Sequence, residues 1–443
     1  MSCLLSRPVA PGTPNRRSTA VERGLGTLRL WSSRLLLSVA DQGLASGGHF
    51  ALNILLIRSL SPSEYGAFAV TFAIFLLAAG LHNALILEPM GVIGPTRYGE
   101  RLPEYLGRAV WMHAGLSLLI TAVLLLVTAG MAAARSSLAP AMFGLSFSAP
   151  FILLFWLFRR ACYLETRPNL ALRGSLLYLV LLLAGTAVLW RLNSLSAAGA
   201  FVLMGAASIA VSLLLWRCLR VRAENVLSAQ ASPGPAEVVR HHWAYARWSL
   251  ASTVLYWLAS SIYLPLVGAL AGLREVAAFR ATDNLLLPMS QVLTAVSLLL
   301  LPLLSRQHSL RGREYLRATA VKIALVAASA AGVYVLGILM FGGRLIRLLY
   351  GGDYYARYFS LLPYLGASLV LRAVGDTGFG VAARAAGRPD IEFWATVAGA
   401  ALTLTAGLGL VSRYGAAGAA AGWTTSSAAS CLVSVCFFRS QLK

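Results

Sequence analysis

The first long apolar segment of the chain carries a stripe of polar side chains. The stripe consists of Gln42, Ser46, His49 and Asn53. Their spacings of four, three and four residues place them on one side of a helix, which turns by about 100° per residue. In hydrocarbon such groups need partners, water or a ligand, so we expect this face to border a bundle interior or a hydrated path. On another face, Gly43 and Gly47 form a GxxxG pattern that predicts close packing against a neighbouring helix.

Two carboxylates lie at the same end of the first two apolar segments. Asp41 flanks the polar stripe, and Glu88 precedes Pro89 at the end of the second segment. A close pair of carboxylates raises the pKa of one of them, so the pair could couple transport to protons or sodium. The alternative interpretation is that Glu88 is an interfacial residue.

The second half of the chain has charged groups in comparable apolar surroundings. One segment carries Arg280, Asp283 and Asn284, and a later one carries Arg372 and Asp376. Arg372 and Asp376 are four residues apart, a spacing that favours an ion pair on one helix face. Alternatively, Arg372 faces a transport path and binds a diphosphate, for which the permanently charged, forked guanidinium is suited.

Further arginines cluster where the apolar segments of the first half end. The predicted entrance carries Arg97, Arg101, Arg159 and Arg160. Such clusters set membrane orientation and meet anionic lipid headgroups, and some members could also collect a phosphate-bearing substrate. The adjacent His241 and His242 lie in a polar stretch, where we expect them to be solvated.

The composition decides the broad class of the protein. Of its 443 residues, 58% are hydrophobic and only 12% are charged, whereas soluble domains carry about 25% charged residues. The net charge of +21 comes from short clusters between apolar runs, a distribution typical of membrane-protein loops and not of nucleic-acid binding. No P-loop, GxSxG or HExxH motif occurs, and the five cysteines show no metal-binding spacing. We therefore predict neither an enzyme nor a bound cofactor.

The apolar segments predict an all-α polytopic membrane protein with about twelve transmembrane helices. The expected spans are 34–57, 66–90, 106–134, 138–158, 170–190, 196–218, 246–272, 276–304, 317–341, 358–386, 391–411 and 416–438. With both termini in the cytoplasm, Lys and Arg show a roughly threefold excess on that side, as the positive-inside rule requires. The expected organisation is a disordered basic tail (1–33), a first lobe (34–218), a linker (219–245), a second lobe (246–438) and a short cytoplasmic tail (439–443).

The two halves show a weak internal repeat. Aligning Glu64 with Glu275 gives an offset of 211 residues, close to the 212 between the first expected span of each half. Repeats of this kind build transporters in which the substrate path lies between two lobes.

Three stretches resemble a known family. "RSLSPSEYGAFAV", "LIRLLYGGDYYARYFSLLPYLG" and "SRYGAAGAAAGWTTSS" are similar to stretches of bacterial polysaccharide and O-antigen repeat-unit flippases. These flippases belong to the multidrug/oligosaccharidyl-lipid/polysaccharide exporter (MOP) superfamily. The resemblance implies two pseudo-repeated six-helix lobes around a central cavity. Many members of the family have fourteen spans, so twelve is a departure.

The resemblance also implies a substrate and a location. The substrate would be an undecaprenyl-diphosphate-linked oligosaccharide, flipped from the cytoplasmic to the outer leaflet of a bacterial inner membrane. Besides the bilayer, the polymerase and chain-length proteins of the same pathway would be possible partners, and nucleic acid would not. An ion-coupled multidrug exporter of the same superfamily is the first alternative. A membrane enzyme of polysaccharide assembly, a polymerase or ligase, is the second.

Overall fold

The computed structural model describes residues 20–219, 234–351 and 353–441, and in these ranges every regular element is a helix. The first lobe contains α1 (Ala20–Ser59), α2 (Pro62–His82), the π-helical turn η1 (Asn83–Leu87), α3 (Glu88–Arg97), the 3₁₀ turn η2 (Gly99–Arg101), α4 (Leu102–Ala133), α5 (Ala139–Leu164), α6 (Pro168–Arg191) and α7 (Ala197–Cys218).

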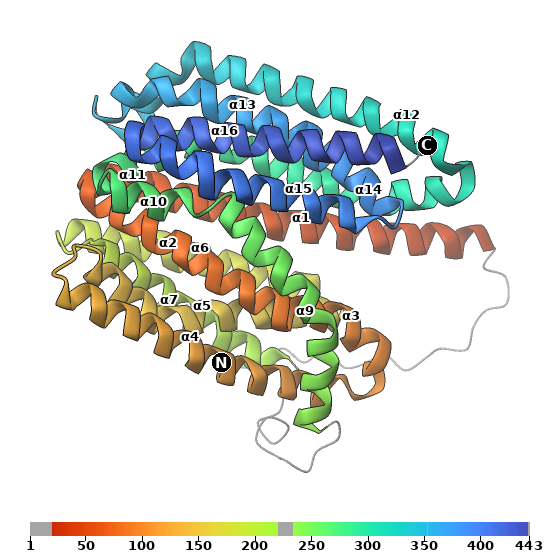
Figure 1. The fold of residues 1–443 in the computed structure, drawn as a ribbon. Coiled ribbons are helices and arrows are strands. Elements are labelled where there is room, and N and C mark those ends of the chain that lie inside the picture. The colour runs from red at the N-terminus through yellow and green to blue at the C-terminus, as the bar shows by residue number, and fades with distance from the viewer. Residues whose placement is uncertain (1–19, 220–233, 352, 442–443) are drawn as a thin grey trace.

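The second lobe is also built only from helices in the described residues, but these helices are interrupted more often. It contains α9 (Pro235–Ala259), α10 (Tyr263–Leu270), α11 (Leu273–Asn284), α12 (Leu287–Tyr350), η3 (Tyr355–Leu361), α13 (Leu362–Arg372), η4 (Ala373–Gly380), α14 (Val381–Ala385), α15 (Pro389–Leu402), η5 (Thr403–Gly407) and α16 (Leu408–Gln441). Figure 1 shows the two lobes side by side, with α9 crossing between them. The predicted all-α, two-lobed fold is confirmed.

Two very long helices each hold two membrane crossings. α12 is interrupted at Gly312 and α16 at Gly415, where φ is 76° and 54°. These left-handed conformations strain residues that carry a Cβ, so glycine permits the chain to reverse there. With both helices divided, and with the bent pair α9–α10 counted as one span, the described chain makes twelve crossings.

The ends and the outer surface of the bundle fit a membrane. We call the end with the Gly312 turn and the last residue of α16 the basic end, and the other the opposite end (Figure 1). Leu118 and Leu126 on α4 and Met340 on α12 are each more than 70% exposed. Large apolar side chains exposed to this degree along the helices are suited to contact with lipid tails.

The internal repeat is visible as the same cap built twice. The Glu64 carboxylate in the first turn of α2 accepts a bond from the backbone N–H of Ala197, where α7 begins, at 2.9 Å. Glu275 in the first turn of α11 accepts from the N–H of Ala416, directly after the break in α16, at 3.3 Å. Each glutamate thus satisfies a free helix N-terminus in its own lobe, and the alignment of Glu64 with Glu275 is confirmed.

Some expected boundaries are wrong. α1 begins at Ala20, so residues 20–33 are helical and not a disordered tail. α9 begins at Pro235 and takes up the second part of the expected linker, while α16 runs into the expected C-terminal tail as far as Gln441. Residues 1–19, 220–233 and 442–443 lie outside the described residues. Residues 20–33, 235–245 and 439–441 lack apolar periodicity, which predicts tails or a linker. In the structure they extend α1, α9 and α16 beyond the apolar part of each helix.

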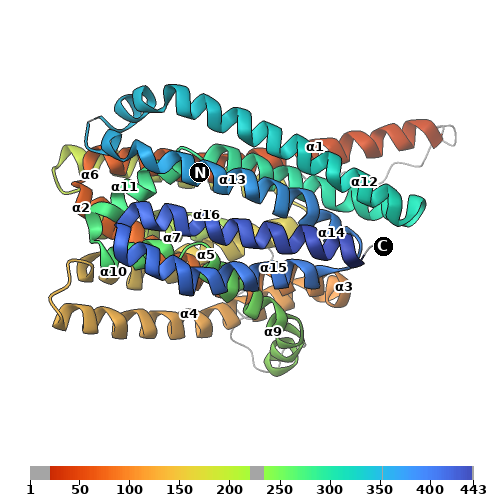
Figure 2. The same ribbon diagram turned by 45° about the horizontal axis from the view of Figure 1, so that its top comes forward.

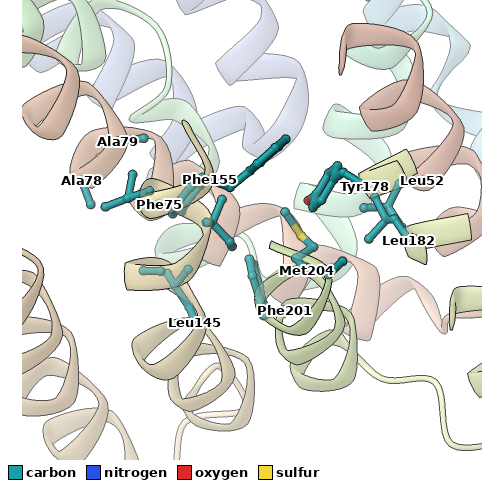
Figure 3. Packing of buried hydrophobic residues seen from close by; sticks show 14 of the residues in the cluster. Leu52, Phe75, Ala78, Ala79, Leu145, Phe155, Tyr178, Leu182, Phe201 and Met204 are labelled. Atoms are coloured by element: carbon teal, nitrogen blue, oxygen red, sulfur yellow. The ribbon is translucent and has the colours of Figure 1, made fainter. Parts of the chain in front are cut away.

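The lobes share a core near the opposite end. Buried side chains of α1, α2, α5, α6 and α7 fill the first lobe, among them Leu52, Phe75, Phe155, Tyr178 and Phe201 (Figure 3). The same cluster continues into Ala277, Ala281 and Tyr350 of the second lobe. At this point the backbones of α2 and α11 approach so closely that a Cβ at residue 66 would overlap the carbonyl oxygen of Leu273. Gly66 therefore permits the closest contact between the lobes.

Replacing Gly66 with Ala should destabilise the protein, because the added methyl group meets backbone that cannot rotate away. We expect a loss of about 1–3 kcal/mol in the free energy of unfolding, measured by thermal or denaturant unfolding in detergent. The matched control is Gly115→Ala on α4, where an added Cβ meets nothing within 4 Å. Equal stability of both variants would show that the α2–α11 contact does not require glycine.

Candidate functional site

A buried hydrogen-bond network links the two lobes at the opposite end. The Tyr65 hydroxyl donates to the Asn53 side-chain oxygen at 3.0 Å and accepts from the Asn284 side-chain nitrogen at 2.8 Å. Asn53 and Tyr65 belong to the first lobe and Asn284 to the second, and all three are buried. A hydrogen bond shielded from water is costly to break without a replacement. The network and the Gly66 contact together close this end.

The charged pair next to this network is formed as expected. Arg280 Nη1 lies 2.9 Å from Asp283 Oδ2, one helical turn along α11, and both side chains are mostly buried. The pair contains equal and opposite charges, so it brings polarity to the inner face of the second lobe without net charge.

The polar stripe of α1 faces several partners. Ser46 donates to the side-chain oxygen of Gln291 on α12 at 3.2 Å, which is a contact between the lobes. The His49 ring lies 6.0 Å from Phe72, and its Nδ1 is buried without a hydrogen-bond partner among the described residues. Gln42 is exposed and accepts from Arg159 at 3.3 Å. The stripe therefore borders the junction of the lobes, as predicted from its spacing.

The two carboxylates of the first lobe do not pair with each other. Asp41 is fully buried and bound by Arg159, whose Nε and Nη2 both lie 2.8 Å from Oδ2, and by the Tyr163 hydroxyl. Glu88 accepts from two hydroxyls of α9, Tyr245 at 3.2 Å and Ser249 at 2.5 Å. The coupling pair proposed from the sequence is thus replaced by two separate sites, because α5 and α9 supply other partners.

Arg372 and Asp376 also do not form the expected ion pair. Among the described residues, neither has an oppositely charged group within 4.0 Å. The Arg372 guanidinium lies over the Trp423 ring, 5.3 Å from its centroid, and its Nε is buried without a hydrogen-bond partner. The backbone after Arg372 is π-helical from Ala373 to Gly380, a local form frequent at functional sites.

Other polar groups of the second lobe surround this pair. Tyr256 of α9 is 60% exposed, and its hydroxyl lies within electrostatic range of Arg372, Asp376 and Glu392. Glu392 pairs with Arg384 at 3.4 Å. Charged groups of α13, η4 and α15 thus lie near the exposed side chain of Tyr256.

The remaining cations of the predicted entrance are spread over the basic end. Arg160 lies against Gly91 of α3, in the space that a side chain there would fill. Arg97 lines a cavity of about 430 Å³ between α3 and α9, together with Thr96 and His241. Arg101 is exposed in η2. Of the four predicted cations, Arg159 alone contacts the stripe, through Gln42.

α1 and α12 lie side by side and are in contact across the junction of the lobes (Figure 2). An added Cβ at Gly43 or Gly47 would meet nothing within 4 Å, so the expected GxxxG packing surface is wrong. Gln42 and Gln291 are exposed on the two facing helices. The structure is therefore closed at the opposite end and loosely joined along this seam.

Several residues of the site were not predicted. Tyr65 belongs to a stretch that resembles the flippase family, but neither it nor Tyr163 and Trp423 is predicted to take these roles. Their local sequences, SPSEYGAF, RRACYLETR and AAGWTTSS, do not indicate which distant groups they meet. Their roles depend on partners from distant segments.

Comparison of the sequence with family models and with curated proteins finds no match. Among solved structures, the chain is similar to the inward-facing conformation of a multidrug resistance MATE family transporter of the MOP superfamily. The TM-score is 0.75 at 16% identity, over 92% of this chain and 97% of that one. The lipid II flippase MurJ in an inward closed conformation has a TM-score of 0.70 at 14% identity, over 92% and 87%.

An outward-facing MATE family transporter matches with a lower TM-score of 0.63, at 18% identity over 92% of this chain and 95% of that one. At these identities the comparisons establish the fold, which this chain shares with these MATE transporters and with MurJ. The predicted resemblance is confirmed at the level of the fold.

Replacing Tyr65 with Phe should favour opening of the opposite end, because Asn53 and Asn284 lose their shared partner. The penalty for buried unpaired groups, about 1–3 kcal/mol, would increase the reaction of a cysteine placed at Ala277 with a maleimide at least severalfold. The control is Tyr334→Phe, which removes a 2.7 Å bond to the Leu285 carbonyl within the second lobe. A similar increase in both variants would indicate general loosening and contradict a role in closure.

Proposed function

We propose that this chain flips an undecaprenyl-diphosphate-linked oligosaccharide from the cytoplasmic to the outer leaflet of a bacterial inner membrane, by alternating access. The fold is shared by MATE transporters and by the lipid II flippase MurJ, so the fold does not choose between drug and lipid-linked sugar. The choice rests on one observation, the state of Arg372.

Arg372 is an interior cation without an ion-pair partner among the described residues. Arg159, Arg280 and Arg384 each contact a carboxylate, while Arg372 lies on the face of Trp423 with no carboxylate within 4.0 Å among the described residues. A ring face holds a guanidinium in place but leaves its edge free. That edge presents paired N–H donors that match phosphate oxygens. We assign to it the diphosphate of the substrate.

Neutral polar groups near the junction of the lobes would bind the sugars. Gln42, Ser46 and Gln291 offer amide and hydroxyl groups along the seam between α1 and α12, and Tyr256 offers an exposed ring and hydroxyl. Sugars are bound through such hydrogen bonds and through stacking on aromatic faces. The same loose seam would let the headgroup enter while the polyprenyl tail stays in the bilayer.

The transport step would then exchange one closed end for the other. The Asn53–Tyr65–Asn284 network has to open to release the headgroup outside, and contacts near the basic end have to form in its place. Because the buried hydrogen bonds at the opposite end are few, the two states can differ by only a few of them. An ion gradient, or consumption of the product outside, would make net transport run outward.

A multidrug exporter is the alternative that a specific observation favours. Asp376 has no ion pair within 4.0 Å among the described residues, and an unpaired carboxylate suits a cationic drug. We do not propose a membrane enzyme, since the similar solved structures are described as transporters and a flippase.

Replacing Arg372 with Ala should abolish flipping without lowering the amount of folded protein. The substitution leaves no carboxylate without an ion-pair partner, because Arg372 forms no ion pair among the described residues. In cells that lack the gene but keep the downstream polymerase, lipid-linked oligosaccharides should accumulate in the inner leaflet, as measured with an impermeant sugar-modifying enzyme. The wild-type gene and Arg413→Ala, a variant of an exposed arginine at the opposite end, should reverse the accumulation, whereas Arg372→Ala should not.

Two other outcomes would contradict the proposal. Unchanged lipid intermediates together with new sensitivity to cationic dyes, lost again in Asp376→Asn, would establish the exporter. Disappearance of Arg372→Ala from the membrane would make Arg372 a structural residue.

A further inference from the structure

The first helix of the second lobe is attached to the first lobe by a histidine. His242 of α9 was expected to be solvated, but only 1% of it is exposed. Its Nδ1 lies 3.0 Å from the carbonyl oxygen of Leu85 in η1, and its Nε2 lies 2.8 Å from the Tyr105 hydroxyl of α4. Both ring nitrogens of His242 are therefore bound to the first lobe. His242 itself lies before the apolar part of α9, which begins at Ser249.

The Leu85 carbonyl is available because of a proline. In an α-helix this carbonyl would accept the backbone N–H four residues later, and that residue is Pro89, which has none. The chain here is the π-helical turn η1. A carbonyl oxygen only accepts, so Nδ1 of His242 carries the proton. Nε2 of the neutral ring then accepts from the Tyr105 hydroxyl, which is itself fully buried. The contact fits one tautomer of neutral histidine.

The surroundings oppose a second proton on His242. Its polar partners are a carbonyl and a hydroxyl, and burial lowers the pKa of His242 below the usual value. The Tyr105 ring stacks on Tyr98 at 4.7 Å, and the Tyr98 hydroxyl contacts His241 at 2.6 Å. Glu237, Arg240, Arg97 and Arg101 are the charged groups that act on Tyr98 and His241, and Glu88 binds Tyr245 one turn along α9. The pKa of His241 is also lowered, by partial burial and then by Arg97.

Further contacts keep the rest of α9 on the first lobe. Tyr245 and Ser249 bind Glu88, and the Trp257 indole N–H donates to the Ala73 carbonyl at 2.8 Å. Beyond Ala259 the chain bends by 44° into α10, whose Tyr263 and Val267 lie in the core of the second lobe. α9 therefore contacts α2, η1 and α3 of the first lobe as well as α15 of the second, and the bend leads from it into the core of the second lobe.

We propose that His242 is a proton-sensitive latch, which holds α9 on η1 and α4 while it is neutral and releases the basic half of α9 when it takes up a proton. A protonated ring would place an N–H against the Tyr105 hydroxyl, whose own proton would then need another acceptor. It would also bury a charge without a carboxylate in contact. Release to water removes both penalties. Besides His242, the Tyr98 hydroxyl contacts His241 and Glu237, and Glu88 and Trp257 also hold α9 on the first lobe.

The direction of the pH effect follows from linkage. The pKa of His242 is lower in the latched than in the released state, so the latch is fully formed above the ordinary histidine value of about 6.5. It weakens as the pH falls below that value. For one proton, the ratio of released to latched molecules rises about tenfold per pH unit until the latched form itself is protonated.

Spin labels on the two elements would measure this opening. Thr96 of α3 and Ala244 of α9 are exposed and line the same cavity. Cysteines would be introduced at these positions in the full-length chain, with its five native cysteines replaced. Spin labels attached to them would report the α3–α9 distance by double electron–electron resonance in nanodiscs. We expect one short distance at pH 8 and a second, longer one whose share grows towards pH 5.

His242→Gln provides the decisive variant, since an amide donates to the Leu85 carbonyl and accepts from Tyr105 but does not titrate here. It should keep the short distance at pH 5, while His241→Gln should respond like the wild type. Opening of His242→Gln at pH 5, or a wild-type distance that does not change with pH, would overturn the proposal.

Pro89→Ala tests the latch without touching the histidine. The new backbone N–H would compete for the Leu85 carbonyl, so the longer distance should already be populated at pH 8. If Pro89→Ala keeps the wild-type distances at every pH, the carbonyl is not the partner that holds α9, and the latch as proposed is wrong.

Discussion

Polar groups within hydrocarbon have to find their partners inside the protein, and this constraint shapes the whole molecule. The helix N-termini at Ala197 and Ala416 are satisfied by Glu64 and Glu275. The carbonyl freed by Pro89 is satisfied by His242. Where the groups are buried, each such bond is expensive to lose. Polar contacts therefore decide which helices move together, while apolar packing fills the space between them.

The repeat creates two contacts between the lobes, one made by α1 and one by α9. They are related by the repeat but differ in the number of hydrogen bonds that hold them. α1 begins the first lobe and α9 begins the second, and each runs beside the other lobe. α9 is bound through His242, Tyr245, Ser249 and Trp257. Towards the basic end, α1 meets α12 through Ser46 and Gln291, beside glycines that touch nothing. This asymmetry gives the bundle one side that is held by several hydrogen bonds and one side that is held by fewer of those described.

Charge pairing explains why few residues of the interior are left for a substrate. The interior arginines Arg159 and Arg280 each have a carboxylate partner, which limits the net charge of the desolvated interior. Arg372 and Asp376 are exceptions on one short stretch, where the backbone is π-helical. Each can attract a ligand of opposite charge. Anionic and cationic substrates are therefore distinguished by which of these two residues is essential.

Composition and periodicity determined the fold class and the number of spans, because a chain of this hydropathy can satisfy its backbone only as membrane helices. The alignment of Glu64 with Glu275 also came from the sequence, because their offset of 211 residues agrees with the 212 between the first expected spans of the two halves. Similarly, the spacing of Gln42, Ser46, His49 and Asn53 identified the face of α1 at the junction. These features depend on local periodicity or on regular repetition.

The tertiary structure decided which partner each polar group takes. Asp41 pairs with Arg159 and not with Glu88, Arg372 lies on Trp423 and not beside Asp376, and His242 is buried. All these partners come from helices more than thirty residues away in the chain, and helix spacing carries no information about them. The sequence therefore specified which faces are polar, and the packing of the helices, which follows from shape and close contact across the bundle, specified what those faces bind.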